Sequence, residues 1–355
     1  MIRSAMKLIK RRIAEHVNKL IATAMVCTAC IMHPETVIAA GDTGLLSIKS
    51  CGGSQLEISW DIVPGSDGYR IYRATAYHGA YSLLKDSQTN QFIDVVGPGT
   101  RYYYKVRAYQ MVNGKKSYGK YSSVKTGYIK AKGVPTSTPV REISKLKVSG
   151  SQLIVVSVEN KSTTKANVSF YTKTKNGNWI IDFSTIGYIG KNGLGKTREG
   201  DKKTPAGLFR FTAAFGIAAE PENVGIPYVQ VNDTHWVVSD SDSEYYNRFV
   251  TTAKNGDGYM QTLEAAQDWN AAEGEQLYQY TQCYQYSLIL NYNPENIPGE
   301  GSAIFLHCYS DNQYTGGCIA VPEARMKYLL QQLAFADNEI TASIIIDTAD
   351  KIGTY

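Results

Sequence analysis

The chain contains the stretches Ile304-Phe305-Leu306-His307-Cys308-Tyr309 and Thr315-Gly316-Gly317-Cys318-Ile319-Ala320. The first is an apolar run typical of a buried strand, and it brings His307 to the end of that strand. A loop of about ten residues then returns through two glycines to Cys318. Because a thiol reacts as its thiolate, a nucleophilic cysteine needs a base beside it. The two stretches therefore predict that His307 is the base for Cys318.

The glycine pair before Cys318 suits the same chemistry. The N–H groups of Gly317 and Cys318 are candidate donors to the oxyanion that forms when the sulfur attacks a carbonyl. An active Cys318 is expected to have a lowered pKa and to react quickly with electrophiles. The alternative interpretation is a small buried cysteine and an unrelated strand-end histidine, which is the default for either residue alone.

Length and composition fit a globular protein of two domains. The 355 residues exceed one typical domain, and 43% hydrophobic with 19% charged residues gives no sign of disorder. The formal charge of +5 is spread evenly, without the dense Lys/Arg stripe of nucleic-acid binders, so we expect no nucleic-acid partner. The 26 tyrosines and 31 glycines favour a mainly β fold with many turns.

Residues 1–40 have the order of a secretory signal peptide. A basic region in residues 3–19 precedes an apolar run at 20–32, and Val37-Ile38-Ala39-Ala40 is a small-residue cleavage site. The run is shorter than the ~20 residues that span a bilayer. We therefore expect a secreted, extracytoplasmic protein, with no stable membrane span after cleavage. The alternative is an uncleaved N-terminal anchor.

Four cysteines follow position 40, namely Cys51, Cys283, Cys308 and Cys318. They are too few for a disulfide scaffold, and their spacing lacks the paired C-x-x-C pattern of a zinc site, so we expect no metal. Cys283 and Cys308 both lie on expected strands. Whether they form a disulfide stays open.

Residues 45–129 are expected to form a β-sandwich. Apolar and polar residues alternate through Leu56, Ile58 and Trp60, and the same period of two recurs at 69–73 and 102–109. Turns rich in proline and glycine separate these runs. With Trp60 and the segments 68–73 and 99–108, the region resembles a fibronectin type III module. We expect a spacer, or a module that contacts wall glycan or protein.

Residues 130–142 contain Pro135 and Pro139 and lack hydrophobic periodicity, so we expect a stiff linker. Residues 143–355 form the second expected domain, with strands at 153–158, 286–290 and 303–307. A helix is predicted within 322–335, because apolar residues recur there at helical spacing (Met326, Leu329, Leu330 and Leu333). This domain is expected to be rich in β structure, with a few helices.

Over roughly 200 residues this second domain resembles the catalytic domain of the L,D-transpeptidases, the YkuD family. The segments that carry the resemblance are 195–207, 236–240, 245–248, 301–307 and 315–320. Two features depart from the commonest pattern: Gly316 stands where a second histidine is usual, and the loop after His307 is short. Both fit the branch of the family that shares segments 236–240 and 245–248.

The resemblance implies a cysteine-dependent acyltransferase that acts on peptidoglycan stem peptides. Cys318 would be the nucleophile and His307 the base, oriented by a backbone carbonyl that follows it. A tetrapeptide stem would be the donor, and the amine of a second stem would complete the cross-link. Water in place of that amine would give an L,D-carboxypeptidase, and the rival from another class is a non-catalytic wall-binding protein. No metal or organic cofactor is needed.

Five other residues are expected to contact the substrate. Two arginines could hold carboxylates in bidentate pairs, two aromatic residues could wall a groove, and a threonine could shape the turn or donate a hydrogen bond near the sulfur. They are Arg198, Arg248, Trp236, Tyr309 and Thr315.

Overall fold

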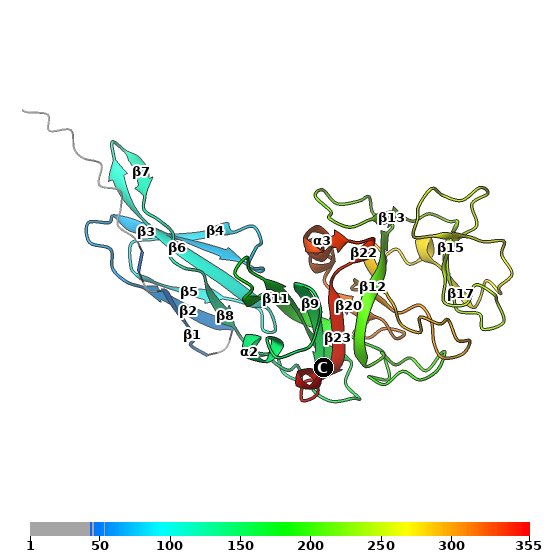
Figure 1. Ribbon diagram of the computed structural model, residues 1–355. Helices are drawn as coiled ribbons and strands as arrows, with labels where there is room; N and C mark the ends of the chain where they lie inside the picture. Colours follow the sequence, from blue (N-terminus) through cyan, green and yellow to red (C-terminus); the bar gives the residue numbers. More distant parts are fainter. Residues whose placement is uncertain (1–42, 45, 53) are drawn as a thin grey trace, which may run out of the picture.

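The computed structural model describes residues 43–44, 46–52 and 54–355. The expected signal peptide at residues 1–40 lies outside the described residues. Within them, no helix is both long and apolar enough to cross a membrane. Two β-rich units follow each other along the chain and lie end to end (Figure 1).

The first unit is a sandwich of two sheets. One sheet has the order β1-β2-β5, with β1 at Leu46–Ser50, β2 at Gln55–Trp60 and β5 at Gln91–Val95. The other consists of β3 (Gly68–Ala74), β4 (Ser82–Ser87), β6 (Arg101–Val112), β7 (Lys115–Tyr118) and β8 (Lys125–Tyr128). Leu56, Ile58 and Trp60 are buried between the sheets with Tyr104 and Val106, which confirms the predicted alternation.

The segment between the units packs against both of them. It has no regular structure until the short helix α2 (Val140–Ile143). Ala131 and Val134 are buried, and the Thr138 carbonyl accepts a hydrogen bond from the Tyr171 hydroxyl at 2.6 Å. The residues expected to form a linker therefore connect the two units as an ordered segment whose side chains and backbone pack against its surroundings.

A nine-stranded sheet forms the frame of the second unit. Its order is β13-β12-β18-β19-β20-β11-β10-β9-β23, and β12 also pairs with β23, which closes the sheet on itself. The strands are β9 (Gln152–Val158), β10 (Lys165–Lys173), β11 (Trp179–Tyr188), β12 (Gly207–Gly216), β13 (Tyr228–Gln230), β18 (Ser287–Leu290), β19 (Phe305–Cys308), β20 (Ile319–Val321) and β23 (Ser343–Thr348). Closure buries a continuous apolar core.

The predicted helix is present as α3 (Glu323–Gln332), which follows Pro322. Proline fits the start of a helix because no helical partner is needed there for the N–H that it lacks. The helix packs Met326, Leu329 and Leu330 into the core of the closed sheet.

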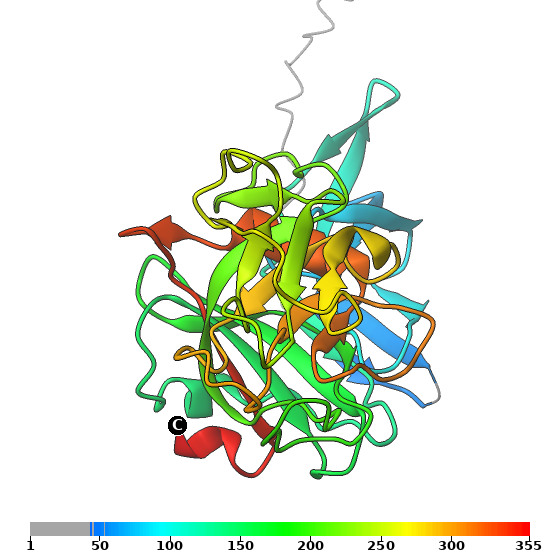
Figure 2. The same cartoon turned by 90° about the vertical axis from the view of Figure 1, so that its right-hand side faces the viewer.

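A smaller sheet lies at the end of the second unit that is far from the first (yellow in Figure 1). Figure 2 looks onto this end and shows the small sheet in front of the large one. Its order is β16-β15-β14-β17, with β14 at His235–Val238, β15 at Phe249–Thr251, β16 at Leu263–Glu264 and β17 at Gly274–Gln276. The remaining elements are the hairpin β21 (Phe335–Ala336) and β22 (Glu339–Ile340), and the short 3-10 helices η1 (Leu277–Gln279) and η2 (Ile352–Thr354).

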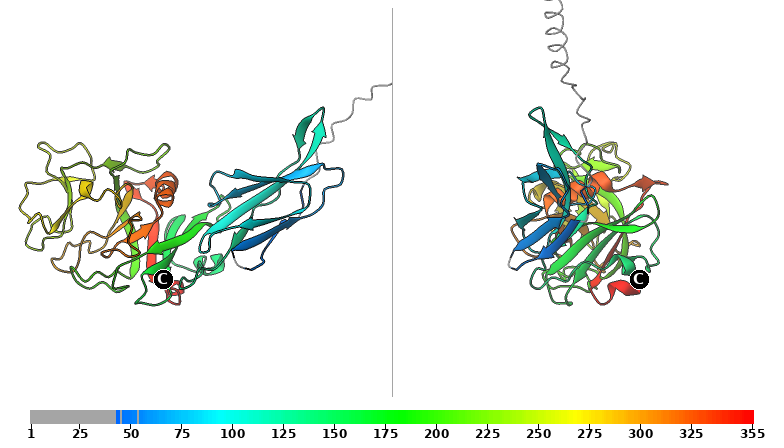
Figure 3. Two further views of the ribbon diagram at one scale, coloured as in Figure 1. Left: turned by 180° about the vertical axis from the view of Figure 1, so that it is seen from behind. Right: turned by 90° about the vertical axis from the view of Figure 1, so that its left-hand side faces the viewer.

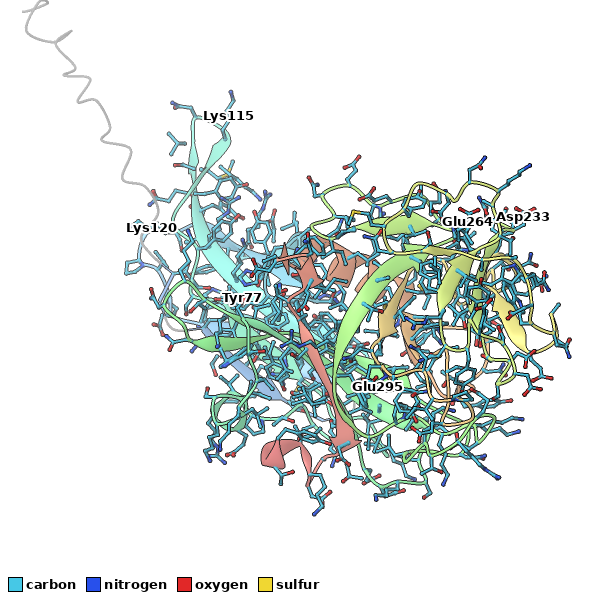
Figure 4. All side chains as sticks on the ribbon, turned by 45° about the vertical axis from the view of Figure 1, so that its right-hand side comes forward. Tyr77, Lys115, Lys120, Asp233, Glu264 and Glu295 are labelled. Atoms are coloured by element: carbon cyan, nitrogen blue, oxygen red, sulfur yellow. The ribbon has the colours of Figure 1, made fainter. Side chains whose placement is uncertain are left out.

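Asp182 on β11 connects the two units, whose end-to-end arrangement is also visible from behind in the left panel of Figure 3. One carboxylate oxygen accepts the His78 N–H and the other accepts the Tyr328 hydroxyl, each at 3.0 Å. The Asp182 carbonyl accepts the N–H of Tyr77, which is labelled in Figure 4, at 2.7 Å. These bonds fix the first unit against β11 and α3.

Replacing Asp182 by alanine is expected to destabilise the protein by about 1–3 kcal/mol, because the His78 N–H and the Tyr328 hydroxyl lose their acceptors in a buried interface. Thermal unfolding measures the effect. Asp182→Asn keeps an acceptor and should lose less. Asp233→Ala, at an exposed position far from the junction (Figure 4), serves as the control. Equal unfolding temperatures for Asp182→Ala and this control would contradict the proposed role of Asp182.

Candidate active site

The parallel pairing of β19 and β20 brings the two expected catalytic residues together. Leu306 lies opposite Ile319 and His307 opposite Ala320. Because side chains alternate across a strand, Leu306 and Ile319 enter the main core, whereas His307 points to the opposite face. Cys318, one residue before β20, packs on that opposite face in a second apolar cluster.

The sulfur of Cys318 lies between two backbone groups just before His307. The thiol donates to the Ala303 carbonyl at 3.2 Å and accepts the Phe305 N–H at 3.3 Å. Ala303 has a φ of 52°, which is rare for a residue with a side chain, and its N–H donates to Asn247 Oδ1 at 3.2 Å. This left-handed residue explains why β19 starts at Phe305, two residues later than predicted.

His307 has a defined tautomer. Its Nδ1 lies 2.7 Å from the Cys308 carbonyl, which can only accept, so Nδ1 carries the proton and Nε2 is left as a base. This is the backbone carbonyl after the histidine that was expected to orient it. The side chain is buried, and burial lowers the pKa of His307 to about 4. The imidazole is therefore neutral at neutral pH.

Cys318 is only 7% exposed, and this burial raises the pKa of its thiol well above the usual range. The negative charge of Glu275 raises it further, while the Phe305 N–H lowers it. The expectation of a lowered Cys318 pKa is therefore wrong for the resting protein. The resting thiol and imidazole are therefore both neutral.

The turn before Cys318 is held by two threonines. Thr315 Oγ1 donates to the Cys318 carbonyl at 2.7 Å and accepts the Gly317 N–H at 3.1 Å. Thr204 Oγ1 lies 2.7 Å from the Gly317 carbonyl. Gly317 has a φ of 152°, and a Cβ there would lie 3.0 Å from the Lys203 carbonyl, so the turn needs glycine. Since its N–H is bound to Thr315, Gly317 is not a free oxyanion donor in this state, contrary to expectation.

A cavity of about 410 Å³ opens over the sulfur. Its wall includes His307 and Cys318, the turn from Thr315 to Gly317, and charged side chains of both signs. The charged residues are Lys191, Lys196, Lys202, Glu199 and Glu275. Among the described residues, no group of three or more His, Cys, Asp or Glu side chains is placed to hold a metal ion.

The comparisons with known proteins agree with this geometry. Residues 151–346, more than half of the chain, match the L,D-transpeptidase catalytic domain known as YkuD. The chain belongs to this family. No match was found among curated proteins.

The first unit is similar to solved fibronectin type III domains. An Fn3-like protein from Clostridium thermocellum is 26% identical, covers 25% of this chain and 94% of its own, and has a TM-score of 0.22. The sixth such domain of human fibronectin type III domain containing protein 3 is 16% identical, with 27% and 92% coverage and a TM-score of 0.23.

Of the five expected substrate residues in this YkuD domain, only Thr315 lines the cavity. Arg198 is exposed, and Arg248 lines a separate cavity of about 400 Å³. Trp236 packs against Trp269, with ring centres 5.8 Å apart. The Tyr309 hydroxyl donates to the Ile186 carbonyl.

Several residues of the site were not expected from the sequence. Glu199 Oε2 accepts the hydroxyls of Tyr246 and Ser302 at 2.7 and 2.6 Å. Lys196 forms a buried ion pair with Asp201, with Nζ 3.2 Å from Oδ1. Segment 195–207 was singled out only by its resemblance to the family, and nothing in its charged sequence distinguishes a buried carboxylate from a solvated one.

Because His307 is buried, the free energy of unfolding of the YkuD unit should decrease as the pH becomes acidic. Its folded pKa is about 4 against an ordinary value near ~6.5, so the unfolded chain binds the proton first as pH falls. This stability is fully present above pH ~6.5 and is lost toward pH ~4, by up to about 3 kcal/mol. His307→Gln, followed by thermal unfolding over this range, should lose less than the wild type. Equal losses would contradict the assigned pKa.

Proposed function

We propose that this YkuD protein cross-links peptidoglycan stems through a thioester on Cys318. One observation carries the proposal: a thiol held by Ala303 and Phe305 lies in one cavity with a histidine whose Nδ1 is bound to a carbonyl and whose Nε2 is a neutral base. A neutral base is the form needed to take a proton from a neutral thiol.

The first half of the reaction forms the thioester. His307 Nε2 takes the thiol proton as the sulfur attacks the carbonyl of the third stem residue. The Cys318 N–H is the donor we assign to the oxyanion, because the Gly317 N–H is bound to Thr315. The bond to the terminal D-Ala then breaks, and the imidazolium gives its proton to the leaving amine. His307 is then neutral again, and Cys318 carries the acyl group as a thioester.

The second half transfers the acyl group. The amine of a neighbouring stem attacks the thioester carbonyl, the C–S bond breaks, and the thiol is regenerated. Attack by water instead would trim the stem. The exposed Lys191 and Lys202 at the cavity suit the carboxylates of stem peptides, a role expected earlier for Arg198 and Arg248.

Export directed by residues 1–40 would place this activity at the cell wall. In the part of the chain that the structure describes, the first unit carries no part of the cavity, since all the residues that line it lie between Lys191 and Cys318. We assign it the role of a spacer fixed through Asp182, or of a module that contacts the wall.

The mature protein incubated with purified disaccharide tetrapeptides should give dimers that lack one terminal D-Ala, detected by mass spectrometry. Cys318→Ala should give none, because the acceptor of the acyl group is removed. Cys283→Ala removes the other free thiol at the cavity and should retain the thioester. Products from Cys318→Ala that equal those of the wild type would overturn the proposal. Trimmed stems without dimers would assign hydrolysis instead.

A further inference from the structure

We propose that Glu275 is the subsite for the amino group of the acceptor, and that it directs the acyl-enzyme toward an amine rather than water. This inference rests on the proposed function, because it concerns the second half of the same reaction. It assigns a role to a side chain that neither binds the donor nor exchanges a proton with it in the first half of the reaction.

Glu275 is held beside the reacting pair. It lies on β17, opposite Val237 of β14, and its side chain lines the cavity over Cys318. Its Oε2 accepts the Tyr284 hydroxyl at 2.6 Å. The Tyr284 ring in turn meets the His307 ring edge to face, with centres 5.5 Å apart. One buried tyrosine therefore fixes the carboxylate relative to the histidine.

The two glutamates of the cavity differ in what they bind. Glu199 uses both oxygens, because Oε1 accepts the Gly200 N–H while Oε2 accepts two hydroxyls. Glu275 accepts one hydroxyl, and among the described residues its Oε1 has no hydrogen-bond donor. Glu199 is thus bound within the fold, whereas Glu275 keeps an oxygen for a ligand.

No cation balances Glu275 among the described residues. Lys196, also at the cavity, is paired with Asp201. Glu275 forms no salt bridge with a described residue, and the groups that interact with its carboxylate include Tyr284, Tyr280, Glu199, Cys283 and Cys318, none of which is cationic. Desolvation of the half-buried side chain raises the pKa of Glu275 to about 7; the charge of Glu199 adds to this effect, and the hydrogen bond from Tyr284 opposes it. A desolvated carboxylate that lacks a cationic partner is stabilised by a cationic ligand.

The second half of the reaction brings such a cation. A primary amine arrives mostly as an ammonium ion at neutral pH. The ammonium gives one proton to Glu275, which later releases it to water. The free amine attacks the thioester carbonyl, and His307 Nε2 takes a second proton from nitrogen as the C–N bond forms. The C–S bond breaks, and the imidazolium returns that proton to the sulfur.

Water is neutral and has no such attraction to a carboxylate. Glu275 should therefore change the ratio of aminolysis to hydrolysis more than the rate of acylation. Acylation should not slow in Glu275→Gln, because loss of a negative charge near Cys318 favours its thiolate.

The test compares Glu275→Gln with Glu273→Gln, an exposed glutamate two residues away that does not line the cavity. Each variant is acylated with a tetrapeptide donor, and the acyl-enzyme is followed by intact mass. The acyl-enzyme then reacts with water in competition with an added amine. The amine is either dansylcadaverine, a charged primary amine, or hydroxylamine, which is largely uncharged at neutral pH. In Glu275→Gln the ratio of dansylcadaverine product to hydrolysis should fall at least about tenfold. The hydroxylamine product should persist.

Glu275→Asp keeps the charge and should lose less than Glu275→Gln. If Glu275→Gln does not fold, the wild-type protein still tests the inference. Because salt screens the attraction between a carboxylate and an ammonium ion, added salt should raise the KM for dansylcadaverine and not the KM for hydroxylamine. Equal ratios in Glu275→Gln and Glu273→Gln, or equal salt effects on both amines, overturn the inference. A wild type that forms no acyl-enzyme on Cys318 refutes the proposed function instead, so the two failures are distinguishable.

Discussion

The site depends on the parallel pairing of β19 and β20. This pairing places the Cys318 sulfur against the Ala303 carbonyl and the Phe305 N–H, on the face of β19 to which His307 also points. The closed sheet buries the other face in the main core, so neither strand can shift without exposing that core. The geometry of the candidate site and the packing of the core are therefore set by the same two strands.

Burial determines the protonation states as well. It keeps His307 neutral and Cys318 a thiol, so no ion pair exists at rest. A buried thiol reacts slowly with electrophiles in solution. In the proposed reaction, Cys318 becomes reactive when the substrate carbonyl is bound and the thiol proton can pass to His307 Nε2. The carboxylate of Glu275 fits this order of events, because it opposes the thiolate before acylation and suits an ammonium ion afterwards.

The fold class and the dyad could be predicted because their signals are local. Alternation around Leu56 and Ile58 predicts the sandwich, and a strand-end histidine followed by Gly-Gly-Cys predicts the site once export and the resemblance to the family are added to it. Glu275 and Ala303 could not be found in this way, since the position of Glu275 depends on a small sheet assembled from distant segments. Arg248 shows the converse: its chemistry suited a carboxylate, yet it lines another cavity.

The most direct test of the neutral dyad is the pH dependence of Cys318 alkylation by iodoacetamide, measured by intact mass. Cys318→Ala corrects for the other cysteines. At rest the thiolate is scarce, so alkylation should be slow at neutral pH and rise only above the ordinary thiol pKa of ~8.5, while acylation by a tetrapeptide proceeds at neutral pH. A fast alkylation rate that is constant from mildly acidic to neutral pH would reveal a preformed thiolate–imidazolium pair and contradict this account.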